Sequence, residues 1–390
     1  MRRWLIGLLV GVGVMAVTAA SAGSAQPALT KANDVMFLAG GNAGAPVARV
    51  TPSPGSGGAA SNGTITILFN RPVRKVIGTT EPTFSPAVAG SWAQIGKEEL
   101  VFTPSGFGFD PGTTVTVSFD RPASVVAAAA TKATVAQTAP TPSYSFAVGT
   151  VSMLGLQQLL AQLQYLPLTF TPAPGVTAPT SLAGDIALMT QPLAGNFAWR
   201  WPSTPASLQA QWTAGAANVL VKGALMSFDS VRGAYNGYQM DPESVGQLAD
   251  ASTWQALIQA AAANQVNPNP YSYISVSKSR PETLTLWQNG AVVLTARVNT
   301  GISSRPTADG TFPIYLRYTE NFMNGTNPNG SRYHDLVHWI NYFNGGDAVH
   351  GFVRGSYGSP QSLGCVELPV STSQTVFSHL AIGDLVTVSG

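Results

Sequence analysis

The chain has 390 residues, of which 45% are hydrophobic and only 10% are charged, and its formal net charge is +2. This length predicts two or three domains, and an ordinary apolar content with few charges excludes charge-driven disorder. The 20 basic residues form no arginine-rich tract, so nucleic acid is not an expected partner. With 40 glycines and 28 prolines, the chain is expected to be rich in turns and β structure.

The first 25 residues have the pattern of a secretory signal peptide. Arg2 and Arg3 precede an apolar run from Trp4 to Val17, and small residues follow up to Ala25, which is the order found in secretion signals. We therefore expect a secreted, extracytoplasmic protein in which residues 26–46 form a flexible linker. An uncleaved signal that anchors the protein is the alternative, and it is the one membrane contact expected.

Residues 47–148 alternate apolar and polar positions over short stretches such as Ile65–Phe69 and Val115–Phe119. Proline and glycine turn signals separate the stretches, which favours an antiparallel β-sandwich. The segments Ile67–Val73 and Leu100–Pro104 resemble the bacterial immunoglobulin-like (Ig-like) domain of actinobacterial wall enzymes. That resemblance implies a spacer domain.

Residues 151–266 change to helical spacing, with apolar side chains every three or four residues in three stretches. These side chains are Leu156, Leu159, Leu160 and Leu163; Ala224, Phe228 and Val231; and Trp254, Leu257, Ile258 and Ala261. With Asp241, these stretches loosely resemble a three-helix peptidoglycan-binding domain. The resemblance implies a small helical domain whose deletion weakens binding to the wall polymer and leaves the chemistry of residues 271–390 intact. Residues 171–215 are an insertion without a predicted fold.

Residues 271–390 return to β patterns. Asn289-Gly290 separates two apolar stretches and predicts a tight hairpin, and residues 312–318 and 385–388 add further alternating stretches. A mainly antiparallel, partly closed sheet is expected. Together the patterns predict a multidomain protein with a β-sandwich, a small helical domain and a C-terminal mainly-β domain.

Cys365 is the single cysteine of the chain, and an unpaired thiol in a secreted protein calls for an explanation. A thiol attacks as the thiolate, and an imidazole such as that of His350 can take its proton and return it to a leaving amine. Backbone N–H groups of Leu363, Gly364 and Cys365 are candidate oxyanion donors. We expect the Cys365 sulfur and a His350 ring nitrogen to lie within about 3–4 Å, or one side-chain rotation from that distance.

The pair His350-Gly351, followed by Ser362-Leu363-Gly364-Cys365, resembles the motif of the L,D-transpeptidase (YkuD) catalytic domain. In that motif a histidine is followed by Ser/Thr-His-Gly-Cys. Thr300-Gly301 and Pro306–Phe312 match as well, so the resemblance covers residues 272–388.

The resemblance implies an enzyme of cell-wall biogenesis, located in the cell wall or periplasm. Cys365 would acylate itself on a peptidoglycan tetrapeptide stem with release of D-alanine, and would transfer the acyl group to an amine to form a 3→3 crosslink. His350 would be the base, and neither a cofactor nor a metal is implied. The implied partners are stem peptides and glycan, and carbapenem-type inhibitors would acylate Cys365.

Leu363 and Glu367 depart from the common motif, which has histidine and a basic or amide residue at these positions. Leu363 is tolerable because the expected oxyanion donors are backbone groups, whereas an acid at 367 would repel a substrate carboxylate. A catalytically decayed peptidoglycan-binding scaffold and a protein that is mainly an L,D-carboxypeptidase are therefore alternatives. A sortase is excluded because no arginine follows Arg354, and papain-like amidases because they place cysteine before histidine.

Residues 318–345 are rich in Asn, Gly, Tyr and Trp and are expected to form a lid over the cleft. The candidate pocket residues are Tyr333, His338, Trp339, Gly351, Ser362 and Glu367. His334 and His338 have the i, i+4 spacing of a helical zinc motif, but a third ligand is missing, so no metal is expected. His379 is expected to be structural.

Overall fold

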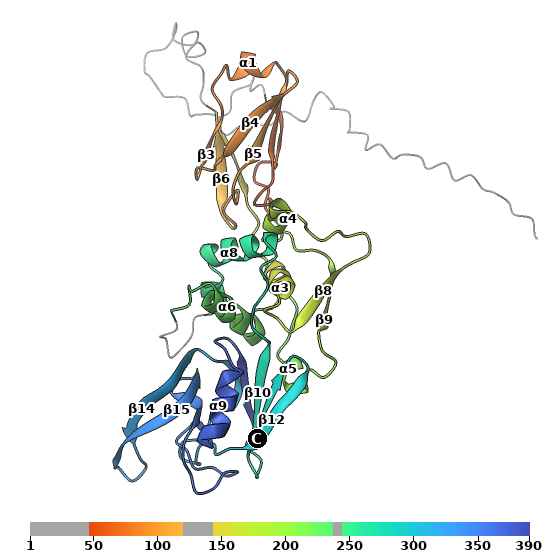
Figure 1. Cartoon of the computed structure of the whole chain (residues 1–390). Coiled ribbons are helices and arrows are strands. Elements are labelled where there is room, and N and C mark those ends of the chain that lie inside the picture. The colour runs from red at the N-terminus through yellow and green to blue at the C-terminus, as the bar shows by residue number, and fades with distance from the viewer. Residues whose placement is uncertain (1–46, 120–142, 237–243) are drawn as a thin grey trace, which may run out of the picture.

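A computed structural model of the chain describes residues 47–119, 143–236 and 244–390. The expected signal peptide (1–25), the expected linker (26–46) and Asp241 lie outside the described residues. Three parts follow one another along an elongated molecule, from the orange strands through the green helices to the blue strands (Figure 1).

The first part is a β-sandwich. One sheet has the order β1 (Val47–Thr51), β2 (Ile65–Phe69), β5 (Glu99–Pro104) and β4 (Gly90–Ile95), and the other β3 (Thr83–Ser85), β6 (Thr114–Ser118) and β7 (Ser143–Ala147), with α1 (Val73–Val76) after β2. All pairs are antiparallel. Alternate residues of β2 and β6 are buried in one core, because successive strand side chains point to opposite faces. The predicted antiparallel sandwich is confirmed.

The middle part packs short helices around an apolar core. Its elements are α3 (Met153–Gln162), β8 (Leu168–Pro172), α4 (Leu182–Ala187), β9 (Gly195–Trp199), α5 (Ala206–Gln209), α6 (Val219–Val231), α7 (Val245–Leu248) and α8 (Ala251–Ala262). The side chains of Ser152, Asn218 and Asp250 cap α3, α6 and α8 by accepting from backbone N–H groups, which fixes where each helix begins. The three helices predicted from apolar spacing are confirmed.

The last part has two sheets and one helix. The first sheet has the order β12 (Ala291–Arg297), β11 (Thr283–Gln288), β10 (Ser272–Ser277), β18 (Leu385–Ser389) and β13 (Gly310–Pro313). The second has the order β14 (Leu316–Thr326), β15 (Arg332–Asn344), β16 (Asp347–Gly351) and β17 (Val366–Leu368), and α9 (Val370–Ser378) packs on it. Two strand pairs, β10–β18 and β16–β17, are parallel, and the others are antiparallel.

The middle and last parts share one core. The apolar cluster of the helices continues into Tyr273, Trp287, Tyr315 and Leu385 of the last part, and the Tyr273 hydroxyl hydrogen-bonds with that of Ser207 at 2.8 Å. Deleting residues 151–266 would therefore expose large side chains of the last part to water. The expectation that the chemistry of residues 271–390 survives this deletion stays a prediction, and the shared core argues against it.

Within the described ranges, no helix combines the length and the apolar character that crossing a membrane requires.

Candidate active site

Two adjacent parallel strands place His350 and Cys365. In β16 and β17, Val349 is the partner of Val366 and His350 is the partner of Glu367. Cys365 comes directly before β17 and packs in one apolar cluster with Ala348, two positions before His350 in β16. Because alternate strand residues share a face, His350 and Cys365 lie on one face of the sheet, one diagonal step apart.

The His350 ring is buried, with 3% of the residue exposed. Its Nδ1 lies 3.3 Å from the carbonyl oxygen of Gly351, which favours the tautomer with the proton on Nδ1 and leaves the Nε2 lone pair available to accept a proton. The Cys365 sulfur contacts the carbonyl oxygen of Gly346 at 3.8 Å, and within the part of the chain that the structure describes it forms no hydrogen bond with His350. The expected separation of about 3–4 Å, direct or after one rotation, therefore stays a prediction.

Burial holds both groups neutral at rest. Burial raises the pKa of the Cys365 thiol to about 12, and the negative charges of Asp347 and Glu367 act in the same direction. Burial lowers the pKa of His350, although the Glu367 carboxylate opposes this shift. The resting site therefore holds a thiol and a neutral imidazole, so a proton transfer to His350 must accompany attack by the sulfur.

The loop before Cys365 has a shape that only glycine permits at position 364. Gly364 has φ +126°, and a Cβ there would lie 2.3 Å from Oδ1 of Asp347. The Ser362 hydroxyl donates to the Cys365 carbonyl oxygen at 2.5 Å and accepts from the Gly364 N–H at 3.2 Å. Ser362 is therefore buried inside the loop and does not face the cleft. The Gly364 N–H is occupied, which leaves Leu363 and Cys365 as the candidate backbone oxyanion donors.

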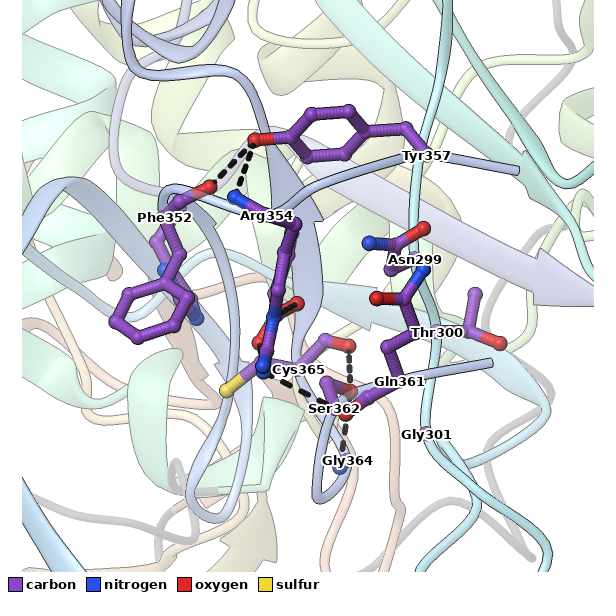
Figure 2. Close-up of polar contacts among 12 residues, drawn as sticks. Asn299, Thr300, Gly301, Phe352, Arg354, Tyr357, Gln361, Ser362, Gly364 and Cys365 are labelled. Atoms are coloured by element: carbon purple, nitrogen blue, oxygen red, sulfur yellow. Dashed lines mark hydrogen bonds and ion pairs between the residues drawn. The ribbon is translucent and has the colours of Figure 1, made fainter. Parts of the chain in front are cut away.

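The buried carboxylate of Glu282 stabilises the segment that hydrogen-bonds to this loop. Glu282 is fully buried and accepts hydrogen bonds from the Thr300 N–H at 2.7 Å and the Thr300 hydroxyl at 2.8 Å. The Thr300 carbonyl in turn accepts from the N–H groups of Gln361 and Ser362. Figure 2 shows Asn299, Thr300 and Gly301 running alongside the Cys365 loop. Sequence analysis missed Glu282, and no local pattern marks it, because its partner lies 18 positions away.

Tyr333 lies on the same face of β15 as Val337, the face that is turned toward Cys365. Burial raises the pKa of Tyr333, and a negative charge on Cys365 would add to this shift. Val337, four positions further along β15 and on the same face of the strand, packs in a cluster with Cys365 and Phe352. Tyr333 and Val337 therefore lie on the face of β15 that is turned toward Cys365.

His338 and Trp339 face α9 instead. The register partner of His338 is Gly351, where an added Cβ would meet Ser373 of α9. The Trp339 ring packs against Phe377 of α9, with the ring centroids 5.6 Å apart. The expectation that these two residues line the cleft is corrected, because the other face of β15 looks at Cys365. Gly351 likewise contacts α9 rather than the cleft.

His334 and His338 lie in strand β15 and not on a helix. Four residues of strand span about 13 Å, so the two imidazoles cannot share one metal ion. The His334 ring stacks on Phe322 with centroids 4.3 Å apart, and Nδ1 of His338 lies 3.7 Å from the Glu320 carboxylate.

Glu367 is not a free acid. Its carboxylate, with 5% of the side chain exposed, forms a bidentate ion pair with Arg354 at 2.7 and 2.8 Å. Because this charge is paired with Arg354, the expected repulsion of a substrate carboxylate by Glu367 is weakened. Sequence analysis used Arg354 only to exclude sortases.

Comparisons with known proteins agree with the domain order. Residues 271–388 match the family model of the YkuD L,D-transpeptidase catalytic domain, and residues 42–148 match that of a bacterial Ig-like domain. No curated protein matches the chain.

Solved structures of L,D-transpeptidases are also similar to this chain, with low TM-scores. One from Mycobacterium smegmatis is 14% identical, with 88% of this chain and 98% of that chain covered and a TM-score of 0.29. The catalytic domain of the Enterococcus faecium enzyme is 24% identical, with 30% and 96% covered and a TM-score of 0.28. One from Mycobacterium tuberculosis with a faropenem-derived adduct is 12% identical, with 89% and 99% covered and a TM-score of 0.28. On the two family matches, the chain carries an L,D-transpeptidase catalytic domain that follows an N-terminal bacterial Ig-like domain.

Proposed function

We propose that this chain is a cysteine L,D-transpeptidase that forms 3→3 crosslinks between peptidoglycan stems during cell-wall biogenesis. The observation that supports the proposal is that Cys365 packs in one cluster with Ala348, which shares a face of β16 with His350. The family match supports the reaction class, and the orientation of the His350 ring supports the role of its Nε2 as base.

Acylation begins when the Cys365 sulfur attacks the carbonyl carbon of the amide between the third and fourth residues of a tetrapeptide stem. The thiol proton passes to Nε2 of His350 as the C–S bond forms, and the N–H groups of Leu363 and Cys365 donate to the oxyanion. When the tetrahedral intermediate collapses, the C–N bond breaks and His350 protonates the leaving nitrogen. D-Alanine departs, and a thioester remains on Cys365.

Transfer to an acceptor follows the same steps in reverse order, with an amine as the nucleophile and the Cys365 sulfur as the leaving group. An amine from the side chain of a neighbouring stem attacks the thioester, His350 takes its proton, and the sulfur leaves to recover that proton as a thiol. The new amide is the 3→3 crosslink. If water attacks instead, the product is a carboxylic acid and the protein acts as an L,D-carboxypeptidase.

The same nucleophile would open the ring of a carbapenem and stay acylated. One L,D-transpeptidase among the similar structures was solved in complex with imipenem. The proposal includes secretion, because peptidoglycan lies outside the cytoplasm, and it assigns glycan contact to the parts of the chain before the catalytic domain.

Mass spectrometry of a purified tetrapeptide-stem muropeptide, incubated with the protein, tests the proposal. We expect D-alanine release and a crosslinked dimer with the native chain, and neither product with Cys365→Ala. The Cys365→Ser variant is the matched control, since it keeps the shape and replaces only the sulfur. Binding without any product from the native chain would favour the decayed scaffold, and free tripeptide without dimer would favour the carboxypeptidase.

A further inference from the structure

Arg354 and Glu367 form a partly buried ion pair beside the two reacting side chains. Nε of Arg354 donates to Oε2 of Glu367 at 2.8 Å, and Nη2 donates to Oε1 at 2.7 Å. The Glu367 side chain is 5% exposed and that of Arg354 is 31% exposed. A planar bidentate pair of this kind holds both partners in one orientation.

The pair connects the segments that carry His350 and Cys365. Glu367 is the strand partner of His350. The guanidinium of Arg354 lies over the Phe352 ring at 4.7 Å, and that ring packs edge-on against the His350 ring at 6.2 Å. Glu367 and Phe352, which lie next to His350 in space, are therefore also the two residues that contact the Arg354 side chain.

Arg354 also reaches the cysteine loop. Its Nη2 donates to the carbonyl oxygen of Gln361 at 3.4 Å, and Figure 2 shows its side chain running from the turn after Phe352 down to the loop of Ser362, Gly364 and Cys365. The base of that turn is closed by the Tyr357 hydroxyl, which donates to the Phe352 carbonyl at 2.6 Å and accepts from the Arg354 N–H.

We propose that Arg354 and Glu367 are a positioning pair that fixes His350 against the Cys365 loop and cancels a charge beside them. The pair takes the place of the basic or amide residue that the family motif has two positions after the cysteine. This inference rests on the proposed function, because it assumes that His350 and Cys365 react together.

The physical reason is charge balance in a buried site. Without Arg354, the Glu367 carboxylate would favour a protonated His350 and disfavour the Cys365 thiolate. Without Glu367, the Arg354 guanidinium would favour the neutral form of His350 and the thiolate form of Cys365. The other titratable groups that act electrostatically on the site are Asp347, Tyr315, Tyr333 and Tyr342 on Cys365, and Asp335 and Tyr357 on Arg354. They remain unchanged in either variant.

The test follows the rate at which iodoacetamide alkylates the full chain as a function of pH, measured by intact mass. Cys365 is the single thiol, so the signal has one source whether or not the protein crosslinks peptidoglycan. We expect Glu367→Gln to move the apparent pKa of alkylation down and Arg354→Met to move it up, each by about one unit. Arg354→Lys keeps the charge without the planar fork, so it should keep the native midpoint and lose carbapenem acylation rate by about tenfold.

The matched control is Arg232→Met. Arg232 pairs with Asp229 at 2.8 Å, with side-chain exposures of 29% and 10%, in the helical part, so its loss removes a similar ion pair away from the site. The proposal is overturned if Arg354→Met and Glu367→Gln keep the native midpoint or move it in the same direction. If Arg354→Met does not fold, the shift of Glu367→Gln alone decides. Failure of the muropeptide reaction with an intact alkylation shift would count against the proposed function and not against the pair.

Discussion

Gly223 of α6 and Gly383 of the loop before β18 meet backbone to backbone. A Cβ at position 223 would lie 2.4 Å from the Gly383 carbonyl oxygen, and a Cβ at position 383 would lie 2.2 Å from the Gly223 carbonyl oxygen. This contact seats the helical part directly on the catalytic domain. Because neither segment can move away from the other without opening the shared core, both positions require glycine.

Gly223→Ala should therefore destabilise the protein, although alanine has a higher helix propensity than glycine. We expect a loss of about 1–3 kcal/mol in the free energy of unfolding, from overpacking at the contact. Urea denaturation measures it. Gly246→Ala in α7 is the control, since a Cβ there has room, and it should be neutral or stabilising. Equal effects of the two substitutions would contradict the described seating.

A fragment of residues 271–390 should fail to fold as a stable monomer. Its buried contacts with the helices include Tyr273, Trp287, Tyr315 and Leu385. Exposing a large apolar side chain opposes folding by about 1.5–3 kcal/mol, so four of them approach the whole stability of a typical domain, about 5–15 kcal/mol. The fragment 151–390 should show a cooperative thermal transition by circular dichroism, and a comparable transition for 271–390 would contradict the shared core.

Asp384 should make the protein less stable as pH rises. Burial raises the pKa of its carboxyl to about 8, although hydrogen bonds from backbone N–H groups and the charge of Arg317 lower it. Between the ordinary pKa of an aspartate, about 4, and this raised value, the folded state binds a proton that the unfolded state has lost. The free energy of unfolding contributed by this group therefore falls from pH 4 to pH 8.

Asp384→Asn removes this dependence and keeps an oxygen that accepts from the Ala381 N–H. Urea denaturation over that pH range should show the native chain losing stability relative to the variant. Asp309→Asn is the control, because Asp309 is an exposed partner of Lys278 and contributes little. A constant difference between Asp384→Asn and the native chain would contradict the assignment.

Substitutions of Tyr333 and His338, which lie on opposite faces of β15, should have different effects on the rate of carbapenem acylation. Tyr333→Ala removes a side chain that faces Cys365 and should lower the rate of carbapenem acylation by about tenfold. His338→Ala removes one that faces α9 and should leave that rate within about twofold of native. Stopped-flow absorbance measures both rates. Similar losses for the two variants would show that the cleft includes both faces.

Much of this arrangement could be predicted from local patterns. The β-sandwich follows from alternation in β2 and β6, and the hairpin of β11 and β12 forms at Asn289-Gly290. The facing direction of His338 and Trp339 could not be predicted. Trp339 has φ +58° at a point where the pairing of β15 with β16 shifts register, and such an irregularity reverses the face that a residue shows.

Contacts between segments that are distant in the sequence could not be predicted either. The pairing of Arg354 with Glu367 depends on the turn closed by Tyr357, and the support of Thr300 by Glu282 depends on a buried site. Neither pair has a spacing that marks it in the sequence. The motif around Cys365 indicated the reacting residues, whereas the structure showed that Ser362 shapes the loop from inside.

The rate at which a carbapenem acylates His350→Ala tests the central claim most directly. If His350 takes the thiol proton, the variant should react at least about a hundredfold more slowly than the native chain near neutral pH. It should recover partly as the pH rises, because the thiolate then forms without a base, and also on addition of imidazole, which can enter the space left by the side chain. Near-ultraviolet circular dichroism checks that the variant is folded. Acylation of a folded His350→Ala protein at the native rate near neutral pH would contradict the account.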